Sequence, residues 1–588
     1  MSDSAPAATL LDLLARGGRR PDGGVRFLDR DEKATWVGWG EVRERALAVG
    51  GGLQALGVAP GERVALVFPT GPEFFYAFFG TLAAGAVPVP LYPPVRLGRL
   101  EEYVERTARM LEVAGARLVL ADRRIKAVLG EVVARARPRL GCRTLAALPE
   151  ERPDPPPVSE DHLALVQFSS GTTVEPKAVA LSHRAVLAQV RGLDSFLADT
   201  PEGRDSGASW LPLYHDMGLI GCVFPSLHRD TSLTLVRPEH FVARPALWLR
   251  AISRYRATVS PAPNFGYALC TTRIRDADLD GVDLSSWRLA LNGAEPVAPP
   301  VLRAFAERFA RWGFRPEALT PVYGLSEAAL AVTFSALGRP FASRRLEREA
   351  LAREGRAVDD PEGLEVVSVG RPIPGFRLRV RDQAGRDLPE RRVGRIWIAG
   401  ESLMDGYLDD PAATAAVLRD GWLDTGDLGF VADGELYLTG RAKDVILLRG
   451  RNYAPEPIEH ALAGVPGART GCAVAVSWLP EGAPGEVLGL LVERRRGATV
   501  EQLAALPEAC RAAVLRSTGL AAEEVVVLPP GTLPRTSSGK LRRAEALRLH
   551  LAGELAPPAP VTPLRLATAV ARSRWAYARM GRRGGDSE

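Results

Sequence analysis

Cysteine is rare in this chain of 588 residues, which contains only five. They form no C-x-x-C pair and no cluster with histidine at the spacing of zinc ligands, so the sequence gives no sign of a structural zinc site. Scattered single cysteines are typical of a reducing compartment, and we expect a cytoplasmic location. The five positions are Cys142, Cys222, Cys270, Cys472 and Cys510.

Long apolar runs are also missing. No stretch approaches the roughly 18 uninterrupted apolar residues of a membrane-spanning helix. The segment from Met1 to Leu14 lacks a basic start followed by an apolar core. The sequence therefore predicts neither a secretory leader nor a transmembrane segment.

No sign of charge dominates either. The 75 basic and 70 acidic residues leave a formal net charge of +5, which gives no reason to expect a nucleic-acid partner. Only five of the basic residues are lysines. Because lysine is a compact point charge and arginine a wide planar fork, a lysine kept in such a chain points to a tight anion site. Lys177, Lys443 and Lys540 lie in the motifs described below, whereas chance accounts for Lys33 and Lys126.

What the chain does contain is an ordinary hydrophobic share of 46%, enough for two or three domains with substantial cores. Apolar, strand-like runs alternate with helical patterns in the first part of the chain, which predicts an α/β fold with parallel sheet. The expected strands are 63–68, 86–91 and 117–121, and the expected helices are 73–84 and 100–113. The proline-rich segment 149–160 is predicted to be an exposed connection.

The pattern changes twice toward the C-terminus. Short strands between residues 377 and 399 predict a small β-rich subdomain. After residue 440 we expect strands at 444–448 and 473–477 and helices at 457–462 and 500–516. The sequence thus predicts a large N-terminal domain of α/β subdomains plus the β-rich subdomain (1–440), a small mobile α+β C-terminal domain (441–550) and a basic tail (551–588).

The tail contains a helix start, because Thr562 is followed by Pro563. On that helix Arg565, Arg572 and Arg579 recur every seven residues and form one basic stripe. The pattern fits a solvated helix or a disordered tail. It also fits a docking surface for an acidic carrier protein or for an anionic membrane.

The strongest chemical signal is the stretch from Leu165 to His183. A strand-like run ends in Ser169-Ser170-Gly171-Thr172-Thr173, small hydroxylated residues whose backbone amides and hydroxyls can surround phosphate oxygens. Lys177 follows closely enough to add a positive charge. The stretch is not a G-x-x-x-x-G-K-[ST] loop, and such a run alone is more often a plain turn. Its meaning depends on the motifs that follow.

With those motifs the chain resembles the adenylate-forming superfamily of acyl-CoA synthetases, luciferases and peptide-synthetase adenylation domains. The resemblance spans residues 25 to 545, and five further signatures occur in the superfamily's order. They are Asn292-Gly-Ala-Glu295, Tyr323-Gly-Leu-Ser-Glu327, Trp422-Leu-Asp-Thr-Gly-Asp427, Gly440-Arg-Ala-Lys-Asp444 and Pro534-Arg-Thr-Ser-Ser-Gly-Lys540. One such motif is weak evidence, but six in sequence are specific.

The resemblance implies that ATP and Mg²⁺ are used to activate a carboxylic acid. Attack of a carboxylate on the α-phosphate brings two anions together, so the site must neutralise charge and align the groups. The resemblance gives this role to Lys540 and makes Glu327 and Thr172 the residues that hold Mg²⁺. The implied ATP-binding or AMP-binding residues are Ser169, Ser170, Gly171, Thr172, Thr173, Lys177, Asn292, Gly293, Ala294, Glu295, Tyr323, Gly324, Asp427 and Arg441.

Each of these residues also has a plain structural alternative. Glu327 or Asp427 could cap a helix, and Arg441 could belong to a surface ion pair. Lys443 stands where the superfamily has its hinge, and rotation there would withdraw Lys540 for a second half-reaction, which implies a ping-pong cycle. A surface lysine is the alternative.

The stretch from Trp210 to Ile220 narrows the substrate. Its Tyr-His-Asp-Met-Gly-Leu sequence resembles the fatty acyl-AMP ligase branch, and so does the stretch 261–267. The resemblance makes His215 a catalytic residue. It also implies an acyl pocket, although core packing explains such side chains equally well. The pocket residues are Tyr214, Asp216, Met217, Asn264 and Phe265.

Residues 341–365 are rich in Arg and Glu and resemble the insertion that separates fatty acyl-AMP ligases from acyl-CoA synthetases. In that branch the insertion restrains the small domain and disfavours CoA, so the acyl group passes to the phosphopantetheine thiol of an acyl carrier protein, for instance one of a polyketide synthase. We therefore expect a fatty acyl-AMP ligase. A fatty acyl-CoA synthetase is the alternative, and an inactive adenylate-binding protein is disfavoured because Lys540, Glu327 and Asp427 are all present.

Overall fold

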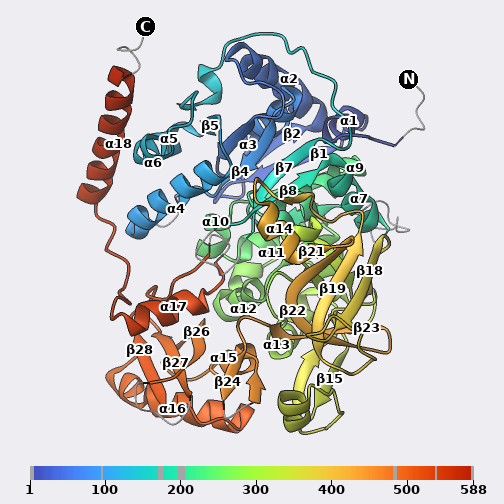
Figure 1. Cartoon of the computed structure of the whole chain (residues 1–588), viewed down its shortest axis with the longest axis vertical. Helices are drawn as coiled ribbons and strands as arrows, with labels where there is room; N and C mark the ends of the chain where they lie inside the picture. Colours follow the sequence, from blue (N-terminus) through green and yellow to red (C-terminus); the bar gives the residue numbers. More distant parts are fainter. Residues whose placement is uncertain are drawn as a thin grey trace.

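The computed structural model describes residues 6–94, 97–169, 176–195, 205–448, 451–480, 486–536 and 539–583. It confirms the predicted α/β class, with a large N-terminal domain above a smaller C-terminal domain in Figure 1. In the part of the chain that the structure describes, no helix combines the length and apolar character needed to cross a lipid bilayer.

The large domain is built around a nine-stranded sheet in the order β17-β14-β13-β12-β11-β9-β10-β1-β2. Neighbours from β13 to β1 pair in parallel, and the pairs at both edges are antiparallel. The strands are β1 (Gly24–Leu28), β2 (Ala34–Gly38), β9 (Gly207–Ser209), β10 (Ser232–Val236), β11 (Val259–Ala262), β12 (Leu289–Asn292), β13 (Leu319–Gly324), β14 (Ala331–Phe334) and β17 (Arg371–Pro372).

Helices pack an aromatic core against this sheet. Trp248, Tyr267 and Phe305 come from three successive helices and are fully buried together with Trp287. The ring centroids of Trp248 and Trp287 are 5.0 Å apart, in the edge-to-face range that favours aromatic pairs. The helices of this part are α7 (His183–Asp194), α9 (Phe224–His228), α10 (Pro238–Ala243), α11 (Ala246–Tyr255), α12 (Asn264–Arg273) and α13 (Pro299–Phe309).

A second, four-stranded sheet of the order β4-β3-β5-β6 is parallel throughout. It confirms the strands and helices predicted before residue 122. The elements are α1 (Leu10–Arg16), α2 (Trp39–Ala55), β3 (Arg63–Val67), α3 (Pro72–Ala83), β4 (Val87–Pro90), α4 (Leu100–Val113), β5 (Leu118–Ala121), α5 (Arg123–Lys126), α6 (Gly130–Ala136) and β6 (Cys142–Arg143). The predicted connection 149–160 contains no helix or strand and is mostly exposed.

Antiparallel sheets complete the large domain. The strands predicted between 377 and 399 are present as β18 and β19, and they continue into β22, β21 and β23. The elements are β7 (Leu163–Phe168), β8 (Ala178–Ser182), β15 (Ser343–Leu346), β16 (Leu364–Val367), β18 (Phe376–Arg381), β19 (Gly394–Gly400), β20 (Gly406–Tyr407), α14 (Pro411–Val417), β21 (Leu418–Arg419), β22 (Trp422–Ala432) and β23 (Glu435–Arg441).

The C-terminal domain follows β23. Its elements match the strands and helices predicted after residue 440, and a three-stranded sheet, β26-β27-β28, packs on its helices. They are β24 (Ile446–Leu448), β25 (Arg451–Tyr453), α15 (Pro455–His460), β26 (Ala468–Trp478), β27 (Val487–Arg494), α16 (Val500–Thr518), β28 (Glu524–Leu528) and α17 (Arg543–Leu551).

The stretch 341–365 contacts this small domain directly. The guanidinium of Arg348 donates to the carbonyl oxygen of Ser517 at 3.1 Å, and Arg451 of β25 forms a 2.8 Å ion pair with Glu349. The two domains are therefore joined at a place other than the chain connection near residue 441.

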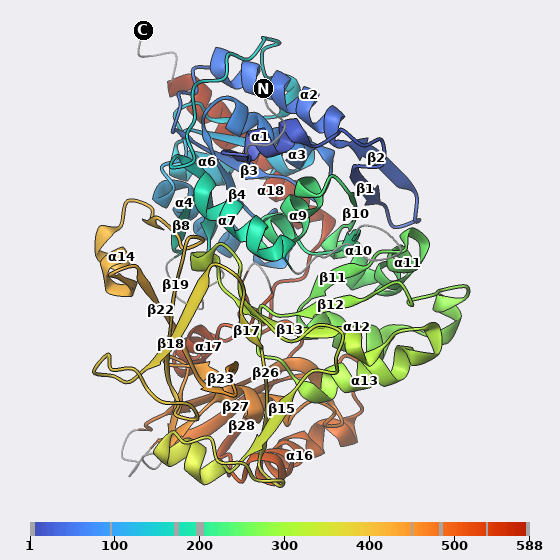
Figure 2. The same ribbon diagram turned by 90° about the vertical axis from the view of Figure 1, so that its right-hand side faces the viewer.

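The tail returns to the large domain as helix α18 (Pro563–Arg583), which begins at the predicted residue. Figure 1 shows it beside α5 and α6, and in Figure 2 it lies behind the upper part of the large domain, away from the rest of the small domain. The Ser573 hydroxyl accepts from the backbone N–H of Gly130 at 2.7 Å, and the Tyr577 hydroxyl donates to the carbonyl oxygen of Lys126 at 3.2 Å. Tyr577 and Met580 pack against the apolar core of the four-stranded sheet. The sequence analysis did not predict this return.

Gly130→Ala tests the docking of α18. A Cβ atom at Gly130 would lie 2.1 Å from the backbone oxygen of Ser573, closer than either backbone can accept. Because alanine suits a helix such as α6, the strain falls on the contact with α18. We expect at least severalfold faster tryptic cleavage at the arginines of α18, measured by limited proteolysis with mass spectrometry.

Gly40→Ala is the matched control, since Gly40 lies in α2 and a Cβ there meets no atom within 4 Å. That variant should be cleaved like the unchanged protein. Equal cleavage of the Gly130→Ala variant would contradict the docked position of α18.

Candidate active site

The predicted site residues begin where strands of the nine-stranded sheet end. Asn292 is the last residue of β12, and Gly324 is the last of its parallel neighbour β13. Ligands of open α/β sheets bind outside the carboxyl ends of the strands. Further predicted site residues lie on or beside two antiparallel strand pairs, β7–β8 and β22–β23.

The predicted phosphate-binding stretch is joined to two antiparallel strands, β7 and β8. The backbone N–H of Ser169 donates to the carbonyl oxygen of Lys177 at 3.0 Å. The Lys177 ammonium lies 4.4 Å from the ring centroid of Tyr407, and β20, which carries Tyr407, pairs with β8. A positive charge is therefore held against an aromatic face at this position. The other predicted members, Ser170, Gly171, Thr172 and Thr173, lie outside the described residues.

The Asn292-to-Glu295 motif forms a close-packed turn after β12. Asn292 is fully buried, and within the described chain its Oδ1 atom has no hydrogen-bond partner. Gly293 packs so tightly that a Cβ would lie 2.7 Å from a methyl carbon of Val322. Ala294 has φ of 67°, a left-handed conformation that a non-glycine residue adopts at a cost and that is frequent at functional sites. This tight turn therefore follows a buried side chain, Asn292, whose Oδ1 atom is available as a hydrogen-bond acceptor.

Asp427 and Arg441 face each other across the β22–β23 pair, as their Cα register requires. Arg441 Nε donates to Asp427 Oδ1 at 3.0 Å, and the Tyr323 hydroxyl donates to Asp427 Oδ2 at 2.7 Å. The Asp427 carboxylate raises the pKa of Arg441, and burial raises the pKa of Tyr323. The three predicted residues therefore form one hydrogen-bonded group, and Asp427 caps no helix.

Glu327 lies in the short 3-10 helix Ser326–Ala328. Its Oε1 atom accepts a hydrogen bond from the Tyr407 hydroxyl at 3.0 Å. Burial, together with the negative charge of Glu327, raises the pKa of Tyr407. The sequence analysis did not single out Tyr407, because only its place beside β8 brings it to Glu327. Ala329, which follows the helix, has φ of 60°.

His215 is oriented by its neighbour in sequence. His215 Nδ1 and Asp216 Oδ1 are 2.5 Å apart, and the Ser326 hydroxyl donates to Asp216 Oδ2 at 2.5 Å. Although burial opposes it, His215 holds the pKa of Asp216 well below its usual range. Asp216 thus links His215 to the Tyr323-to-Glu327 motif, because one of its carboxylate oxygens contacts His215 and the other contacts Ser326. Ser326 is a second residue that the sequence analysis did not name as part of the site.

Lys540 reaches this group from the small domain. Burial and the nearby Arg441 lower the pKa of Lys540, whereas Asp216, Glu295 and Asp427 favour its charged form. Burial raises the pKa of Glu295, whose Oε1 also accepts from the backbone N–H of Phe265 at 2.9 Å. The lysine and the motifs of the large domain are therefore in one electrostatic cluster, although more than 100 residues separate Lys540 from Asp427 in sequence.

Lys443 lies two residues after the end of β23. Burial and the neighbouring Arg441 lower its pKa, and Lys177 adds to that repulsion. Beside it, Asp444 accepts from Arg543 at 3.2 Å, and Arg543 also binds Glu459 at 2.7 Å. Arg543 begins helix α17 just after Lys540, so this ion cluster connects the segment of the predicted hinge to the segment that carries Lys540.

The residues of the predicted acyl pocket differ in burial and in the elements that they contact. Met217 is buried, whereas Phe265 is 38% exposed and lies 5.4 Å, centroid to centroid, from the Trp210 ring. Asn264 Oδ1 accepts from the backbone N–H of Ala298 at 3.3 Å. The Tyr214 ring lies 6.2 Å from that of Tyr92. Asn264 and Phe265 therefore adjoin the turn that holds Glu295, and Tyr214 lies toward the four-stranded sheet.

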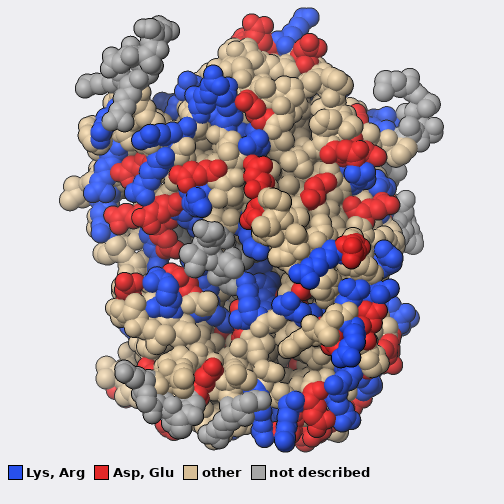
Figure 3. Space-filling model, viewed as in Figure 1, with Lys and Arg blue, Asp and Glu red and all other residues tan. Residues whose placement is uncertain are grey.

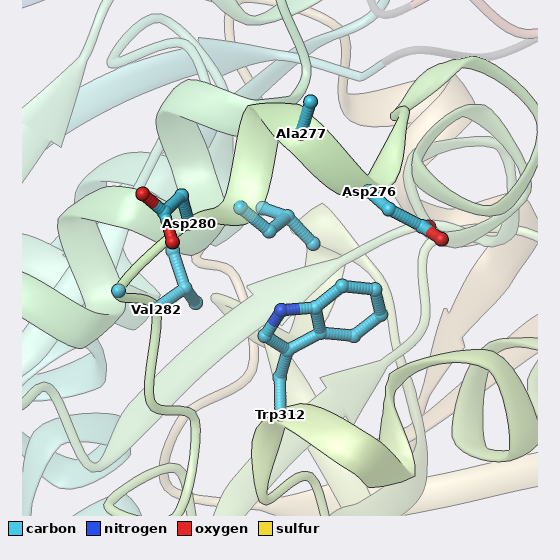
Figure 4. A pocket seen from close by; sticks show the side chains of 7 residues that line it. Asp276, Ala277, Asp280, Val282 and Trp312 are labelled. Atoms are coloured by element: carbon cyan, nitrogen blue, oxygen red, sulfur yellow. The ribbon is translucent and has the colours of Figure 1, made fainter.

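A surface hollow of about 460 Å³ lies elsewhere, between Asp276, Asp280 and Trp312. Figure 4 shows the two carboxylates at its rim and the indole at its floor. None of the predicted site residues lines it. Among the described residues, no group of three His, Cys, Asp or Glu side chains could hold a metal ion.

Comparison with known proteins places this arrangement in a family. The model of the AMP-binding enzyme family matches residues 16–408. A provisionally named acyl-CoA synthetase of Caulobacter vibrioides (strain NA1000 / CB15N) is 38% identical over 538 residues, covering 89% of this chain and 92% of that protein. The long-chain-fatty-acid–AMP ligase FadD26 of Mycobacterium marinum (strain ATCC BAA-535 / M) is 34% identical over 561 residues, covering 89% and 93%.

A solved structure from a study of fatty acyl-adenylate ligases of E. coli and L. pneumophila has a TM-score of 0.86 and 34% identity, covering 93% of this chain and 98% of that one. The chain therefore belongs to the AMP-binding enzymes, the adenylate-forming superfamily that its motifs resemble. Within that superfamily it is a fatty acyl-AMP ligase.

Tyr407→Phe tests the contact with Glu327. The substitution removes one hydroxyl that donates to a carboxylate and leaves the ring beside Lys177. We expect adenylate formation to slow by about 10- to 100-fold, because hydrogen bonds to charged groups are worth roughly 1.5–3 kcal/mol. ATP–pyrophosphate exchange measures the rate. Tyr577→Phe, which removes a hydroxyl bonded to Lys126 instead, should keep the full rate, and equal rates in the two variants would contradict a role for Tyr407.

The pH dependence should report Lys540. Its positive charge is present below its pKa and is lost as the pH rises through that value, which lies below the ordinary 10.5. We therefore expect kcat/KM for ATP to fall along an alkaline limb below pH 10.5. A Lys540→Arg variant should be slower at every pH but lack this limb, because a guanidinium stays protonated to about pH 12. An unchanged limb in that variant would assign it to another group.

Proposed function

We propose that this protein activates a fatty acid with ATP and Mg²⁺, releases pyrophosphate, and transfers the acyl group to the phosphopantetheine thiol of an acyl carrier protein. The observation that carries the proposal is the bonded group of Tyr323, Asp427 and Arg441 in the large domain, together with the electrostatic influence of Asp216, Glu295 and Asp427 on buried Lys540 of the small domain. A lysine from one domain among carboxylates of another gives a charge-matched place for two reacting anions.

The nucleotide fits the turn after β12. Asn292 Oδ1 is a buried acceptor that lacks a partner within the described chain, and an adenine amino group can donate to it. At Gly324 a Cβ would lie 1.8 Å from the carbonyl oxygen of Leu330. Only glycine fits there, because the two backbone segments pack directly against each other. Asp427 is already oriented by Tyr323 and Arg441, and we assign it to the ribose hydroxyls.

The chemical step joins a carboxylate oxygen to the α-phosphorus and breaks the bond to the leaving pyrophosphate. Lys540 and Arg441 would neutralise charge that gathers on the α-phosphate, and Lys177 would face the leaving phosphates. His215, oriented through Nδ1 by Asp216, would present Nε2 toward the reacting groups. In this proposal the chain supplies alignment and positive charge rather than a covalent intermediate.

Glu327 is the described residue that we assign to Mg²⁺, with Thr172 as the second residue implied by the resemblance. Mg²⁺ commonly uses one or two carboxylates together with substrate phosphates, and a single carboxylate held by the Tyr407 hydroxyl suits that arrangement. When bound, Mg²⁺ would offset the charge of the phosphates.

The proposed acceptor is a carrier protein rather than CoA. The contacts of Arg348 with Ser517 and of Glu349 with Arg451 support a small domain that is restrained by the stretch 341–365. The name of the Caulobacter relative favours the alternative, a fatty acyl-CoA synthetase. We also propose a cytoplasmic location, because the five cysteines are free thiols, all buried.

The acyl acceptor can be identified by offering the carrier protein and CoA in parallel reactions. The purified protein is incubated with ATP, MgCl₂ and a mixed pool of fatty acids, and then with a holo carrier protein or with CoA. We expect acyl-adenylates and pyrophosphate in the first step, followed by thioester on the carrier, all detected by mass spectrometry. Lys540→Ala should lower adenylate formation by about 100-fold or more.

The apo carrier, which lacks the phosphopantetheine thiol, is the control and should remain unacylated. Efficient acyl-CoA formation would replace our acceptor with CoA. Full adenylate formation by the Lys540→Ala variant would contradict the assigned role of the lysine itself.

A further inference from the structure

Helix α18 uses only one side to dock on the large domain. Ser573, Ala576, Tyr577 and Met580 follow each other at helical spacing and are buried or half-buried against α6 and its core. The opposite side faces solvent. We define the outer face of α18 as the exposed residues Leu564, Arg565, Arg572, Arg574, Trp575 and Arg579.

We propose that the outer face of α18 docks on an anionic lipid bilayer and lies in its interfacial plane. The inference goes beyond the proposed function. It rests on that function only for the reason why a membrane would be useful, namely that long-chain fatty acids dissolve in one.

The arrangement of residues on the outer face supports this occupant. At 100° per residue, Leu564 and Trp575 lie at nearly the same angle around the helix axis, at the middle of the outer face. Ala571 and Ala578 lie beside them. Arg572 and Arg579 lie on one flank, and Arg574 lies on the other. A narrow apolar strip with arginines on both sides is typical of helices that lie at a membrane interface, where the arginine stems extend to the headgroups.

Among the described residues, no element covers the apolar side chains at the middle of the outer face of α18. Leu564 is 78% exposed and Trp575 is 62% exposed, although the helix has a buried side against α6 that could have received them. The Arg579 guanidinium lies 4.4 Å from the Trp575 ring centroid. Tryptophan is enriched at membrane–water interfaces because its ring is apolar at one end and polar at the other.

The charge around α18 is complementary to anionic lipid. The helix has no acidic residue. The neighbouring stretch 123–143, which contains α5 and α6, has one acidic residue, Glu131, and seven basic ones. Since the whole chain has a net charge of only +5, the remainder is net acidic. Figure 3 shows Lys and Arg side chains gathered over this upper left part of the molecule, with red side chains between them.

An acidic carrier protein is the other occupant that the charges allow. Charge alone does not explain the exposed Trp575 and Leu564 at the middle of the face, whereas an interface with lipid acyl chains does. The observations therefore favour the bilayer, and the carrier protein becomes an outcome of the test.

Flotation of the intact protein with vesicles tests the proposal. One set of vesicles is phosphatidylcholine alone, and the other contains about 30% phosphatidylglycerol. We expect binding to the anionic set only, weakened by added salt because surface attraction is screened. A triple variant, Arg572→Gln, Arg574→Gln and Arg579→Gln, should lose at least tenfold in vesicle affinity, and Trp575→Ala should bind more weakly with all charges kept.

The matched control is Arg495→Gln, Arg496→Gln and Arg516→Gln, three exposed arginines of the small domain, which changes the net charge equally and should bind like the unchanged protein. Equal binding to both vesicle sets, or full binding by the α18 triple variant, would overturn the proposal. Binding to an acidic carrier protein is measured with the same variants. If the unchanged protein binds no vesicles, and the α18 triple variant loses carrier binding, the face belongs to the carrier instead.

Adenylate formation from a short, water-soluble acid is measured on the same samples without vesicles. Both triple variants should retain it, because none of these arginines belongs to the active site. Vesicle binding and adenylate formation thus fail independently, so a wrong proposed function and a wrong membrane surface give different results.

Discussion

The structure depends on one electrostatic constraint, the placement of Lys540 against carboxylates that belong to another domain. Asp216, Glu295 and Asp427 favour its charged form, while burial and Arg441 oppose it. A lone lysine in such a place would lose its proton, and unpaired carboxylates there would repel one another. Each charge is therefore tolerated because the others are present. The cluster therefore favours the arrangement in which the segment carrying Lys540 lies against the large domain.

Three further connections act on the same small domain. Arg543 binds Asp444 beside the predicted hinge and Glu459 within the domain, so the segments that carry Lys443 and Lys540 move together. Glu349 and Arg451 join the domain to the stretch 341–365, and Ser573 fastens the returning tail to Gly130. Any rotation about the chain near residue 441 has to break or stretch the Glu349–Arg451 contact and to act against the docked tail, whereas the contacts of Arg543 move with the domain. Exposed ion pairs contribute little each, so the buried docking of α18 is the stronger of the outer restraints.

Much of this could be predicted from the sequence because the information is local. The apolar runs predicted β3 and β5 to within about a residue, and the motif order brought Asn292, Tyr323 and Asp427 to one site. Tyr407 and Ser326 were not predicted as site residues, since their hydrogen bonds to Glu327 and Asp216 are created only by the fold. The docking of α18 was missed for the same reason, because a glycine at position 130 gains its meaning from a backbone 443 residues away.

The rarity of lysine in the sequence is related to the electrostatics of the site. Burial, Arg441 and, to a smaller extent, Lys177 lower the pKa of Lys443, and Arg441 also helps to lower the pKa of Lys540. Arginine serves elsewhere in the chain, as the surface ion pairs show. Arg441 shows that a guanidinium is accepted beside Asp427, but in the proposed mechanism a wide guanidinium at position 540 would occupy space that the reacting phosphate and carboxylate need. A chain that otherwise uses arginine would therefore keep lysine where the positive charge must be compact and must move with a domain.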